Sequence, residues 1–433
     1  MDSSTEVQTD ACGWRGIVRP REVSVLSSTK RIKVALFLRN FRIGGAETQA
    51  LELASHLDRG KFELYVIALH GDGILREQFE RYAAMYVLTG QGVNTPFSIL
   101  ARLIRYIRRS RVQIVHSFLY ATNFYSLLAK LFVSDIRVII GLRDALEDPY
   151  LGDNSWLSRT KFQLLNICLK TLMPKADSCL SNSDAGKRLY ENRLGVEVKA
   201  IANGVDTDRF TRNPSAAKLL RLAAGVSLEA RVVGMVANCT AYKDYPAFVR
   251  AAKVLASKCA NVHFVSIGED RTEVGASAKR LVTELGLESV FHFLGTRSDL
   301  SVLMPGLDVL CSASVTEGFS NSIAEAMACG VPCVVTDVGD SKRIVGENGI
   351  VVPARNAYAL ATGIEALLNM CPEDAQSLRL KARERIVNNF GVKELAIRHE
   401  HLYESLCFNA SPAAAALQGA EAATSHTSDL QLR

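Results

Sequence analysis

Short apolar runs alternate with helical segments along most of this chain, and they do so in two separate series. In the first series the runs VALFL (34–38), LYVIAL (64–69) and VIIGL (138–142) are rich in β-branched residues. The segment ETQALELASHL (47–57) between two of them has the apolar spacing of a helix. Short β-branched runs separated by amphipathic helices are typical of a parallel sheet with helices on both faces.

A second series begins near Arg231 with RVVGMVAN and repeats the alternation, with a new strand at intervals of roughly 20–30 residues, as expected of βαβ units. The two series are joined by NGVDTDRFTRNP (203–214), which is rich in turn-forming residues. We therefore predict an α/β chain of two doubly wound, Rossmann-like domains. Such domains bind ligands at the carboxyl ends of their strands, and we expect the two to face each other across a cleft.

The expected organisation has five parts. Residues 1–29 show no sustained periodicity and are predicted to be a flexible N-terminal segment. Two Rossmann-like domains are expected over 30–207 and 208–390, followed by a C-terminal helix over 391–409. The remainder, 410–433, is rich in Ala, Ser, Thr and Gln and is predicted to be disordered.

Composition narrows the function. The 433 residues are 48% hydrophobic and 22% charged, with a formal net charge of +6, which suits anionic ligands but does not demand a nucleic acid. The ten cysteines form no Cys-x-x-Cys pair and read as buried, reduced side chains. The N-terminus lacks the apolar core of a signal peptide, and the uncharged stretch 112–129 is too polar for a membrane span. A cytoplasmic protein is expected.

Several residues that follow strands of the first series are candidates for ligand binding. Gly44 and Gly45 in RNFRIGGAET open a helix whose free N–H groups favour an anion, although a plain glycine turn explains them equally well. His116 ends a strand and is either a catalytic side chain or a satisfied core histidine. Arg143 could meet a phosphate, or it could pair with Asp144 or Glu147.

In the second series, Lys243 lies in the loop that leads to a helix near Pro246, where a cation would face a bound anion. The alternative is a solvated lysine paired with Asp244. Gly295 follows a strand and begins a polar loop whose backbone could contact a base.

The segment EGFSNSIAEAMACGVPCVVTD (317–337) is the strongest candidate. Asn321 or Ser322 can cap its helix, and Ser322 with Glu325 fits a capping box, which would explain Glu325 structurally. A capping box does not explain Glu317, which stands at the end of a strand. A carboxylate there suits sugar or ribose hydroxyls, and the free N–H groups of residues 319–322 suit a diphosphate.

A further pair of acids, Asp206 and Asp208, forms a D-x-D triplet of the kind that binds a divalent metal in one class of sugar transferases. The triplet lies in the linker between the two series, and aspartate is common in turns. We interpret it as structural and expect no metal site.

These features resemble glycosyltransferase family 4, the retaining enzymes of the GT-B fold. Glu317 and Glu325 match the E-x7-E motif of that family, within the block EGF-x-N-x-x-x-EAMA-x-G-x-P-x-V-x-T-D-x-G. The resemblance covers most of residues 32–407 and includes GGAE (44–47), NGVD (203–206) and HFLGTRSDL (292–300). It is strongest to bacterial enzymes that build exopolysaccharide, capsule or lipopolysaccharide.

The resemblance implies a retaining transfer of a sugar from a nucleotide sugar, expected to be a UDP-sugar, to a saccharide or lipid-linked saccharide acceptor. It implies three catalytic residues, Glu317 contacting the sugar, Lys243 on the diphosphate and His116 near the sugar. It implies donor-binding roles for Gly44, Gly45, Gly295, Phe319, Ser320, Asn321 and Glu325. It also implies a last helix that crosses back to the first domain, and no metal or other cofactor.

One departure concerns the diphosphate. Many relatives carry an arginine five or three positions before the lysine, and here those positions are Asn238 and Thr240. The charge could instead come from Arg39, Arg42 or Arg297. The missing arginine supports one alternative, a non-catalytic sugar-nucleotide-binding protein. A sugar-nucleotide epimerase or phosphorylase of the same shape is the other alternative.

Between residues 98 and 112, Arg102, Arg105 and Arg109 share one face of an expected helix. This face could contact the anionic inner surface of the cytoplasmic membrane, where a lipid-linked acceptor would lie, or it could be an ordinary solvated surface.

Overall fold

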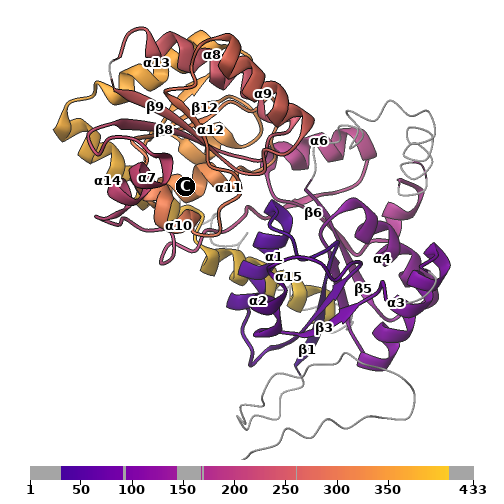
Figure 1. The fold of residues 1–433 in the computed structure, drawn as a ribbon. Coiled ribbons are helices and arrows are strands. Elements are labelled where there is room, and N and C mark those ends of the chain that lie inside the picture. Colours follow the sequence, from indigo (N-terminus) through magenta and orange to yellow (C-terminus); the bar gives the residue numbers. More distant parts are fainter. Residues whose placement is uncertain (1–30, 91–93, 144–166, 168–169, 260, 409–433) are drawn as a thin grey trace, which may run out of the picture. The chain divides into compact units, whose positions relative to one another are not determined.

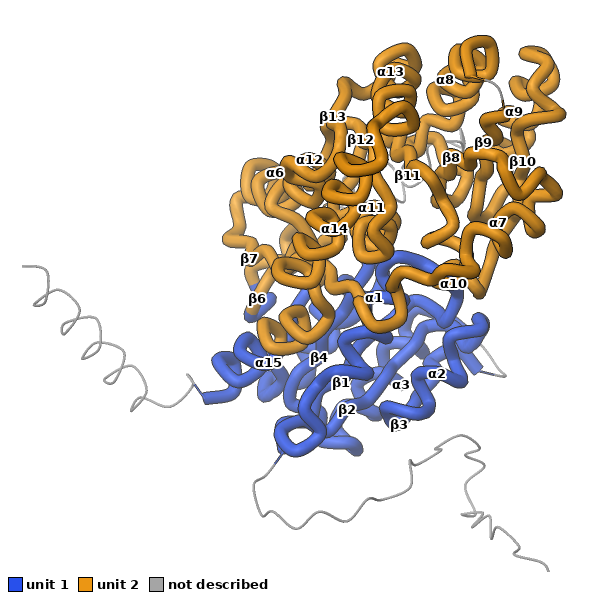
Figure 2. The backbone as a smooth tube through the Cα atoms, turned by 90° about the vertical axis from the view of Figure 1, so that its left-hand side faces the viewer, with its two compact units in different colours: residues 1–140, 175–177, 400–433 blue, residues 141–174, 178–399 orange. Residues whose placement is uncertain are grey.

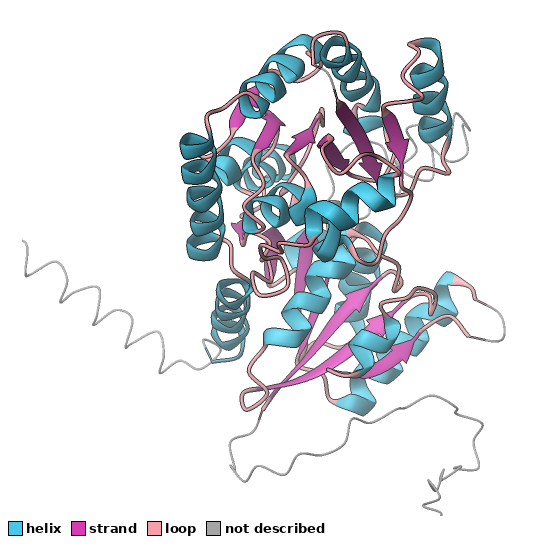
Figure 3. Cartoon of the chain, turned by 60° about the vertical axis from the view of Figure 1, so that its left-hand side comes forward, coloured by secondary structure: helices cyan, strands magenta, loops and turns pink. Residues whose placement is uncertain are grey.

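The computed structural model describes residues 31–90, 94–143, 167, 170–259 and 261–408 (Figure 1). Its contacts divide the chain into two compact units (Figure 2). Unit 1 contains the described residues among 1–140, 175–177 and 400–433, and unit 2 contains those among 141–174 and 178–399. Each unit is built from parallel strands with helices between them (Figure 3).

The strands of unit 1 lie in the order β3-β2-β1-β4-β5, and all neighbours are parallel. The change of direction along the order falls between β1 and β4, as in a doubly wound sheet. Most residues of β1 and β2 are buried, because helices cover both faces of the sheet. The strands are β1 (Ile32–Leu38), β2 (Phe62–Ala68), β3 (Ala84–Val87), β4 (Ile114–Ser117) and β5 (Arg137–Leu142).

The helices that connect these strands start and stop at recognisable signals. Thr95 caps the third of them, where its hydroxyl accepts a hydrogen bond from Ser98 N, and Arg111 ends it in the left-handed conformation. The helices are α1 (Gly45–His56), α2 (Arg76–Glu80), α3 (Pro96–Ser110) and α4 (Tyr120–Phe132).

The last helix, α15 (Val392–Phe408), contributes to both units, since its residues up to His399 belong to unit 2 and those from Glu400 belong to unit 1. Within unit 1, Glu400 accepts a hydrogen bond from Asp58 N at 2.8 Å, and Glu404 pairs with Lys61 at 3.0 Å. The end of α15 is thereby attached to the turn between α1 and β2.

Unit 2 contains a six-stranded parallel sheet of order β10-β9-β8-β11-β12-β13, with its change of direction between β8 and β11. Its strands are β8 (Arg231–Val236), β9 (Val262–Ile267), β10 (Phe291–Phe293), β11 (Val309–Ser312), β12 (Cys333–Thr336) and β13 (Ile350–Val352). Two further strands of the unit, β6 (Ser178–Ser181) and β7 (Lys199–Ala200), pair with each other in parallel.

Two hydrophobic cores lie on opposite faces of this sheet. One contains side chains of α7 (Ala216–Ala224), α11 (Asn321–Ala328) and α14 (Pro372–Asn389). The other contains side chains of α8 (Tyr245–Ala256), α9 (Glu273–Glu284) and α13 (Ala357–Leu368). The remaining helical segments are α6 (Asp184–Leu194), α10 (Leu300–Leu303), α12 (Ser341–Val345), η1 (Met173–Lys175), η2 (Ala241–Lys243) and η3 (Met304–Gly306).

The contact division groups β6, β7 and α6 with unit 2. The domain boundary drawn from the sequence between residues 207 and 208 stays a prediction. One cause of the grouping is visible in the hydrogen bonds. The carboxylate of Asp340, which follows β12, accepts hydrogen bonds at 3.0 Å from the backbone N–H groups of Asp184 and Ala185 at the start of α6. These contacts attach α6 to the sheet of unit 2.

Candidate functional site

The candidate site lies at the change of direction in the sheet of unit 2. Strands β8 and β11 are neighbours there, with Val309 opposite Val233, so the loops that follow them start side by side. Lys243 belongs to the loop after β8, and Glu317 belongs to the loop after β11. In a doubly wound sheet the crevice at this point is where ligands bind, because the two loops diverge from it.

The structure brings Lys243 and Glu317 together. Lys243 Nζ donates a hydrogen bond to Glu317 Oε1, and Ser314 Oγ donates to the same oxygen at 2.8 Å. The Lys243 and Glu317 side chains are only 18% and 10% exposed, so the pair is partly shielded from water. The alternative pairing of Lys243 with Asp244 is not found, because the Asp244 carboxylate instead caps α8 by accepting from Ala247 N at 3.2 Å.

The start of α11 differs from the prediction. The N-cap is Ser320, one residue before Asn321 and two before Ser322, and the Ser320 side chain accepts no hydrogen bond from the first turn. The predicted capping box of Ser322 and Glu325 is therefore wrong. Ser322 lies inside the helix, where its hydroxyl is 3.3 Å from Ser320 Oγ. The N–H groups at the start of α11 are consequently left for another partner.

Close packing fixes the backbone that leads into α11. Gly339 has a φ of +56°, and a Cβ built on it would lie 2.3 Å from Glu317 O. A Cβ on Gly318 would lie 2.7 Å from Asn182 Oδ1. Asp340 N also donates to Gly318 O at 2.9 Å. Glycine is required where backbones approach this closely, and the packing fixes the backbone position of Glu317.

The first residue of α11 is also held from its side chain. Asn203 Nδ2 donates to Asn321 Oδ1 at 2.7 Å, and Arg143 Nη1 donates to Asn203 Oδ1 at 3.0 Å. Arg143 therefore contacts an amide of the NGVD turn. The other partners considered for it, Asp144 and Glu147, lie outside the described residues.

Two of the arginines considered as substitutes for the missing diphosphate cation are engaged elsewhere. Arg42 pairs with Asp72 at 2.6 Å, and Arg297 makes two hydrogen bonds to Asp299 at 2.9 and 2.7 Å. Asn238, at one of the two positions where the resemblance implies an arginine, accepts a hydrogen bond from Glu269 N at 2.9 Å and so fixes the loop after β8.

The other residues of unit 2 predicted to bind the sugar donor follow the carboxyl ends of β10 and β11. Glu325 is one turn into α11 and is half-buried, and Phe319 packs against Phe390 with ring centroids 5.5 Å apart. Gly295 follows β10 with a φ of +65°, and its carbonyl accepts from Gly268 N at 3.0 Å. Gly295 is therefore tied to the loop after β9.

Unit 1 contains three of the predicted site residues, Gly44, Gly45 and His116. Gly44 is the N-cap of α1, and a Cβ on it would meet Glu47 Oε2 at 2.5 Å, so a carboxylate already lies over the beginning of this helix. Gly45 is the first residue of α1. His116 is fully buried in β4, where its Nδ1 lies 2.8 Å from Tyr403 Oη and its ring stacks on Phe118. These contacts are those of a core histidine attached to α15.

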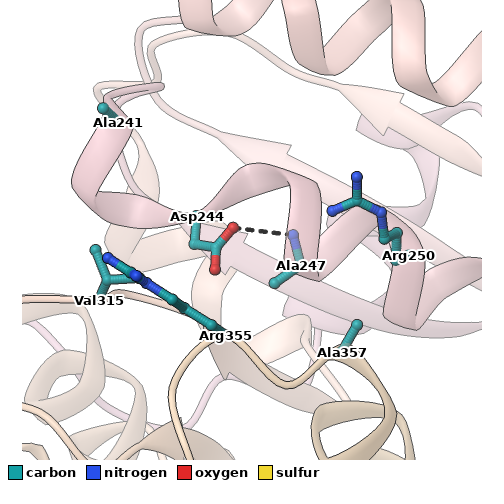
Figure 4. A pocket seen from close by; sticks show the side chains of 7 residues that line it. All are labelled: Ala241, Asp244, Ala247, Arg250, Val315, Arg355 and Ala357. Atoms are coloured by element: carbon teal, nitrogen blue, oxygen red, sulfur yellow. Dashed lines mark hydrogen bonds between the residues drawn. The ribbon is translucent and has the colours of Figure 1, made fainter.

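A pocket of about 340 Å³ opens beside the Lys243 loop (Figure 4). The side chain of Arg355 runs along Asp244, and Arg250 comes from the next turn of α8. The pocket is lined by Ala241, Asp244, Ala247, Arg250, Val315, Arg355 and Ala357. The lining therefore includes two cations, Arg250 and Arg355, and one anion, Asp244, which also caps α8.

Asp206 of the D-x-D triplet stabilises a turn. Asp206 Oδ1 accepts hydrogen bonds at 3.0 Å from the N–H groups of both Asp208 and Arg209, which is the geometry of a turn. Among the described residues, no cluster of three His, Cys, Asp or Glu side chains could hold a metal ion. Within the same residues, no helix is both long and apolar enough to cross a membrane.

Some residues of the site were missed. Asn182 and Asp340 contact the Glu317 segment through tertiary packing, which no local spacing signals. Ser314 is only three residues before Glu317, so its hydrogen bond to that side chain is local. Asn203 was visible only as part of a turn-rich linker, although NGVD belongs to the resemblance.

Comparison with known families accounts for both halves of the chain. Residues 43–209 match the model described as Glycosyltransferase Family 4, and residues 230–370 match the model described as Glycosyl transferases group 1. The first range begins just before α1, and the second contains the loops after β8 and β11 that carry Lys243 and Glu317.

Two curated relatives extend the comparison. An N-acetylgalactosamine-N,N'-diacetylbacillosaminyl-diphospho-undecaprenol 4-alpha-N-acetylgalactosaminyltransferase of Campylobacter jejuni is 24% identical over 349 residues, 78% of this chain and 90% of the relative. A UDP-Gal:alpha-D-GlcNAc-diphosphoundecaprenol alpha-1,3-galactosyltransferase of Escherichia coli is 25% identical over 239 residues, 53% of this chain and 60% of the relative.

A solved structure shares the fold. Anabaena Alr3699/HepE, crystallised with UDP-glucose, superposes with a TM-score of 0.73 at 20% identity, covering 87% of this chain and all of that one. At this identity the likeness establishes the arrangement of strands and helices.

Proposed function

Because this chain is a glycosyltransferase of the GT-B fold, belonging to glycosyltransferase family 4, we propose that it moves a sugar from a UDP-sugar to a saccharide or lipid-linked saccharide acceptor. The place of this step would be polysaccharide or lipopolysaccharide biosynthesis. Two relatives whose names specify diphospho-undecaprenol acceptors support the acceptor class, and a fold neighbour crystallised with UDP-glucose supports the donor.

The observation that carries the proposal is the Lys243–Glu317 pair next to the uncapped start of α11. In the proposed complex the donor diphosphate accepts hydrogen bonds from the free N–H groups near Phe319 and Ser320, where the helix dipole also favours negative charge. Lys243 has three N–H donors and uses one on Glu317, so the others can reach the diphosphate.

Each acid then has a separate task. Glu317, oriented by Ser314 and Lys243, accepts hydrogen bonds from hydroxyls of the transferred sugar. Glu325, one turn further along α11, accepts them from the ribose. The loop after Gly295 lies against the base. The roles that the resemblance implies for Gly44, Gly45 and His116 of unit 1 stay predictions.

We propose a retaining, front-side reaction that needs no metal ion. The bond between the sugar anomeric carbon and the leaving phosphate oxygen breaks as the acceptor oxygen bonds to the same carbon. The acceptor proton passes to the departing phosphate oxygen, whose negative charge Lys243 and the α11 N–H groups stabilise. Proton NMR of the product anomeric centre tests the retained configuration.

Acceptor-dependent UDP release tests the function. Purified protein is incubated with UDP-galactose, UDP-glucose, UDP-N-acetylglucosamine or UDP-N-acetylgalactosamine, with and without an undecaprenyl-diphosphate-linked sugar. We expect UDP only when both substrates are present. Glu317→Gln should reduce the rate at least about 100-fold, because one transition-state interaction of this kind contributes about 3 kcal/mol.

The control variant is Glu347→Gln, which makes the same change on an exposed side chain of unit 2 and should leave the rate unchanged. Conversion of the donor without acceptor would indicate an epimerase instead. Tight UDP-sugar binding with no release under any condition would indicate a non-catalytic binding protein.

We also propose a peripheral contact with anionic membrane through α3. Arg105 and Arg109 are exposed on this helix, and Phe97 at its start is 84% exposed. Arg102 contributes less than expected, because its guanidinium donates to Leu88 O at 2.8 Å and Asn94 Oδ1 at 2.9 Å.

Vesicle flotation with phosphatidylglycerol tests this contact. Arg105→Gln/Arg109→Gln should weaken binding, since each arginine near an anionic surface contributes about 1 kcal/mol. Arg271→Gln/Arg280→Gln removes two exposed charges from unit 2 and should not weaken it. Equal flotation of both double variants would rule out docking through α3.

A further inference from the structure

A chain of two hydrogen bonds leads from a cation to the first residue of α11. Arg143 Nη1 donates to Asn203 Oδ1 at 3.0 Å, and Asn203 Nδ2 donates to Asn321 Oδ1 at 2.7 Å. All three residues belong to unit 2. The middle residue, Asn203, is only 3% exposed, so its amide cannot exchange these partners for water.

The direction of this chain is fixed by chemistry. A guanidinium has N–H donors and no acceptor, so Asn203 must present its oxygen to Arg143. The nitrogen of Asn203 then faces Asn321, which must present its own oxygen in return. The Nδ2 of Asn321 is left on the opposite side, and it makes no hydrogen bond to any residue that the structure describes.

The backbone around Asn203 holds the chain in place. Val205 N donates to Phe390 O at 2.8 Å, and Val392 N donates to Val205 O at 3.0 Å. A Cβ on Gly204 would lie 2.8 Å from Val392 Cα. The turn that carries Asn203 is thus packed against the beginning of α15, and Asn203 cannot shift to release Asn321.

We propose that Asn203 is a positioning residue that, under the control of Arg143, keeps the N–H₂ group of Asn321 turned toward the donor diphosphate at the start of α11. This inference rests on the proposed function of that site. In this proposal Asn321 supplies the diphosphate with a neutral hydrogen-bond donor that Arg143 orients through Asn203.

Asn203→Asp tests the proposal with little change of shape. The new carboxylate accepts from Arg143 as before, but it can only accept, so Asn321 must turn its N–H₂ group toward it. The Oδ1 of Asn321 would then face the diphosphate. We expect the Kd for UDP to rise about 10- to 100-fold, since a charged acceptor is left facing another acceptor. The Kd for uridine, which has no phosphate, should stay unchanged.

A second variant, Asn321→Asp, replaces the amide of Asn321 itself by a carboxylate. Asn321→Asp still accepts from Asn203, but it replaces the outward N–H₂ group by an oxygen, so UDP affinity should fall at least as far. Asn203→Ala frees Asn321 without reversing it and should give an intermediate affinity. Asn348→Asp, with the same charge change on a half-buried residue of unit 2, should bind UDP like the unmodified chain.

Isothermal titration with UDP and uridine decides the matter. The proposal requires the order of UDP affinity unmodified, then Asn203→Ala, then Asn203→Asp, and a loss in Asn321→Asp. If Asn203→Asp does not fold, Asn203→Ala and Asn321→Asp carry the test. UDP affinity unchanged in these variants would overturn the relay while leaving the transferase proposal intact. An unmodified chain that bound no nucleoside diphosphate would instead overturn the proposed function.

Discussion

A single contact between Glu317 and Lys243 distinguishes a shared site from two unrelated surface residues. A glutamate before a glycine and a lysine in a loop each have an ordinary surface explanation. The two side chains are only 10% and 18% exposed, and their hydrogen bond pairs the two charges. Removing either side chain would leave the other charge without its counter-charge. A partly buried ion is costly to leave unpaired, so the two should behave as one unit.

A double-mutant cycle measures this coupling. Lys243→Met and Glu317→Gln should each lower the free energy of unfolding by about 1–3 kcal/mol, because each leaves a partly buried polar partner behind. The double variant should lose less than the sum of the two. Urea denaturation followed by circular dichroism gives the three values.

The comparison pair is Lys258 and Glu365, which are 3.2 Å apart with 44% and 31% of their side chains exposed. Lys258→Met and Glu365→Gln should each change stability by less than about 1 kcal/mol and show little coupling, since water screens a surface pair. Simple additivity at Lys243 and Glu317 would mean that the two charges act separately.

At the scale of elements, one carboxylate joins three segments. Asp340 is 2% exposed, accepts from Asp184 N and Ala185 N at the start of α6, and accepts from Arg343 Nη1 at 3.0 Å. Its backbone N–H group donates to Gly318 O next to Glu317. Asp340 thus holds the start of α6 through its carboxylate and the Glu317 segment through its backbone N–H group.

Asp340→Ala should destabilise unit 2 by about 2–4 kcal/mol, because two backbone donors and one guanidinium lose a buried acceptor. Asp337→Ala, three residues earlier on an exposed side chain, should have little effect. Urea unfolding monitored by fluorescence provides the comparison. Equal stability of the two variants would show that water replaces the carboxylate at the start of α6.

Strands were predictable from the sequence because burial on both faces leaves continuous β-branched runs. VALFL at 34–38 falls inside β1, and LYVIAL at 64–69 overlaps β2 closely. The family resemblance placed Lys243, Glu317 and α11 in one site, and the structure brings these residues together. The amphipathic segment after residue 96 forms α3.

What local patterns could not supply was any contact between distant segments. The cap of α11 was misplaced, because Asn321 Oδ1, a good cap by itself, is taken by Asn203 from 118 residues away. Likewise Asp340 accepts hydrogen bonds from the first two N–H groups of α6, more than 150 residues earlier in the chain. Spacing rules describe neighbours along the chain, and these partners are set by topology.

At the scale of the whole molecule, α15 is the element on which both units depend. Its first half contains His399, which is 1% exposed and shares a hydrogen bond of 2.8 Å with Leu395 O. Burial lowers the pKa of His399 to about 4, the bond to Leu395 opposes that shift, and the Arg143 cation adds to it. The neutral form is therefore strongly favoured in the folded chain.

This difference makes stability depend on pH. An unfolded histidine, with its ordinary pKa of about 6.5, takes up a proton between pH 6.5 and 4, where the folded one does not. The stabilising contribution is present above pH 6.5 and is lost as the pH falls to about 4. The full loss is about 3 kcal/mol.

His399→Asn should flatten the pH dependence of urea unfolding over this window. His401→Asn on the same helix is the control, because His401 is exposed and remains in water. If both variants kept the slope of the unmodified chain, the acid sensitivity would have to come from other groups.

The paired strands β11 and β12 carry Cys311 and Cys333, which are almost completely covered, and burial raises the pKa of both thiols. Cys371 stands exposed beyond α13. A thiol reagent should thus modify Cys371 at once and reach the two inner sulfurs only when the sheet transiently opens. The rate at which Cys311 and Cys333 are modified therefore reports how often the sheet of unit 2 opens. A ligand bound near Glu317 should stabilise the closed sheet and slow that modification.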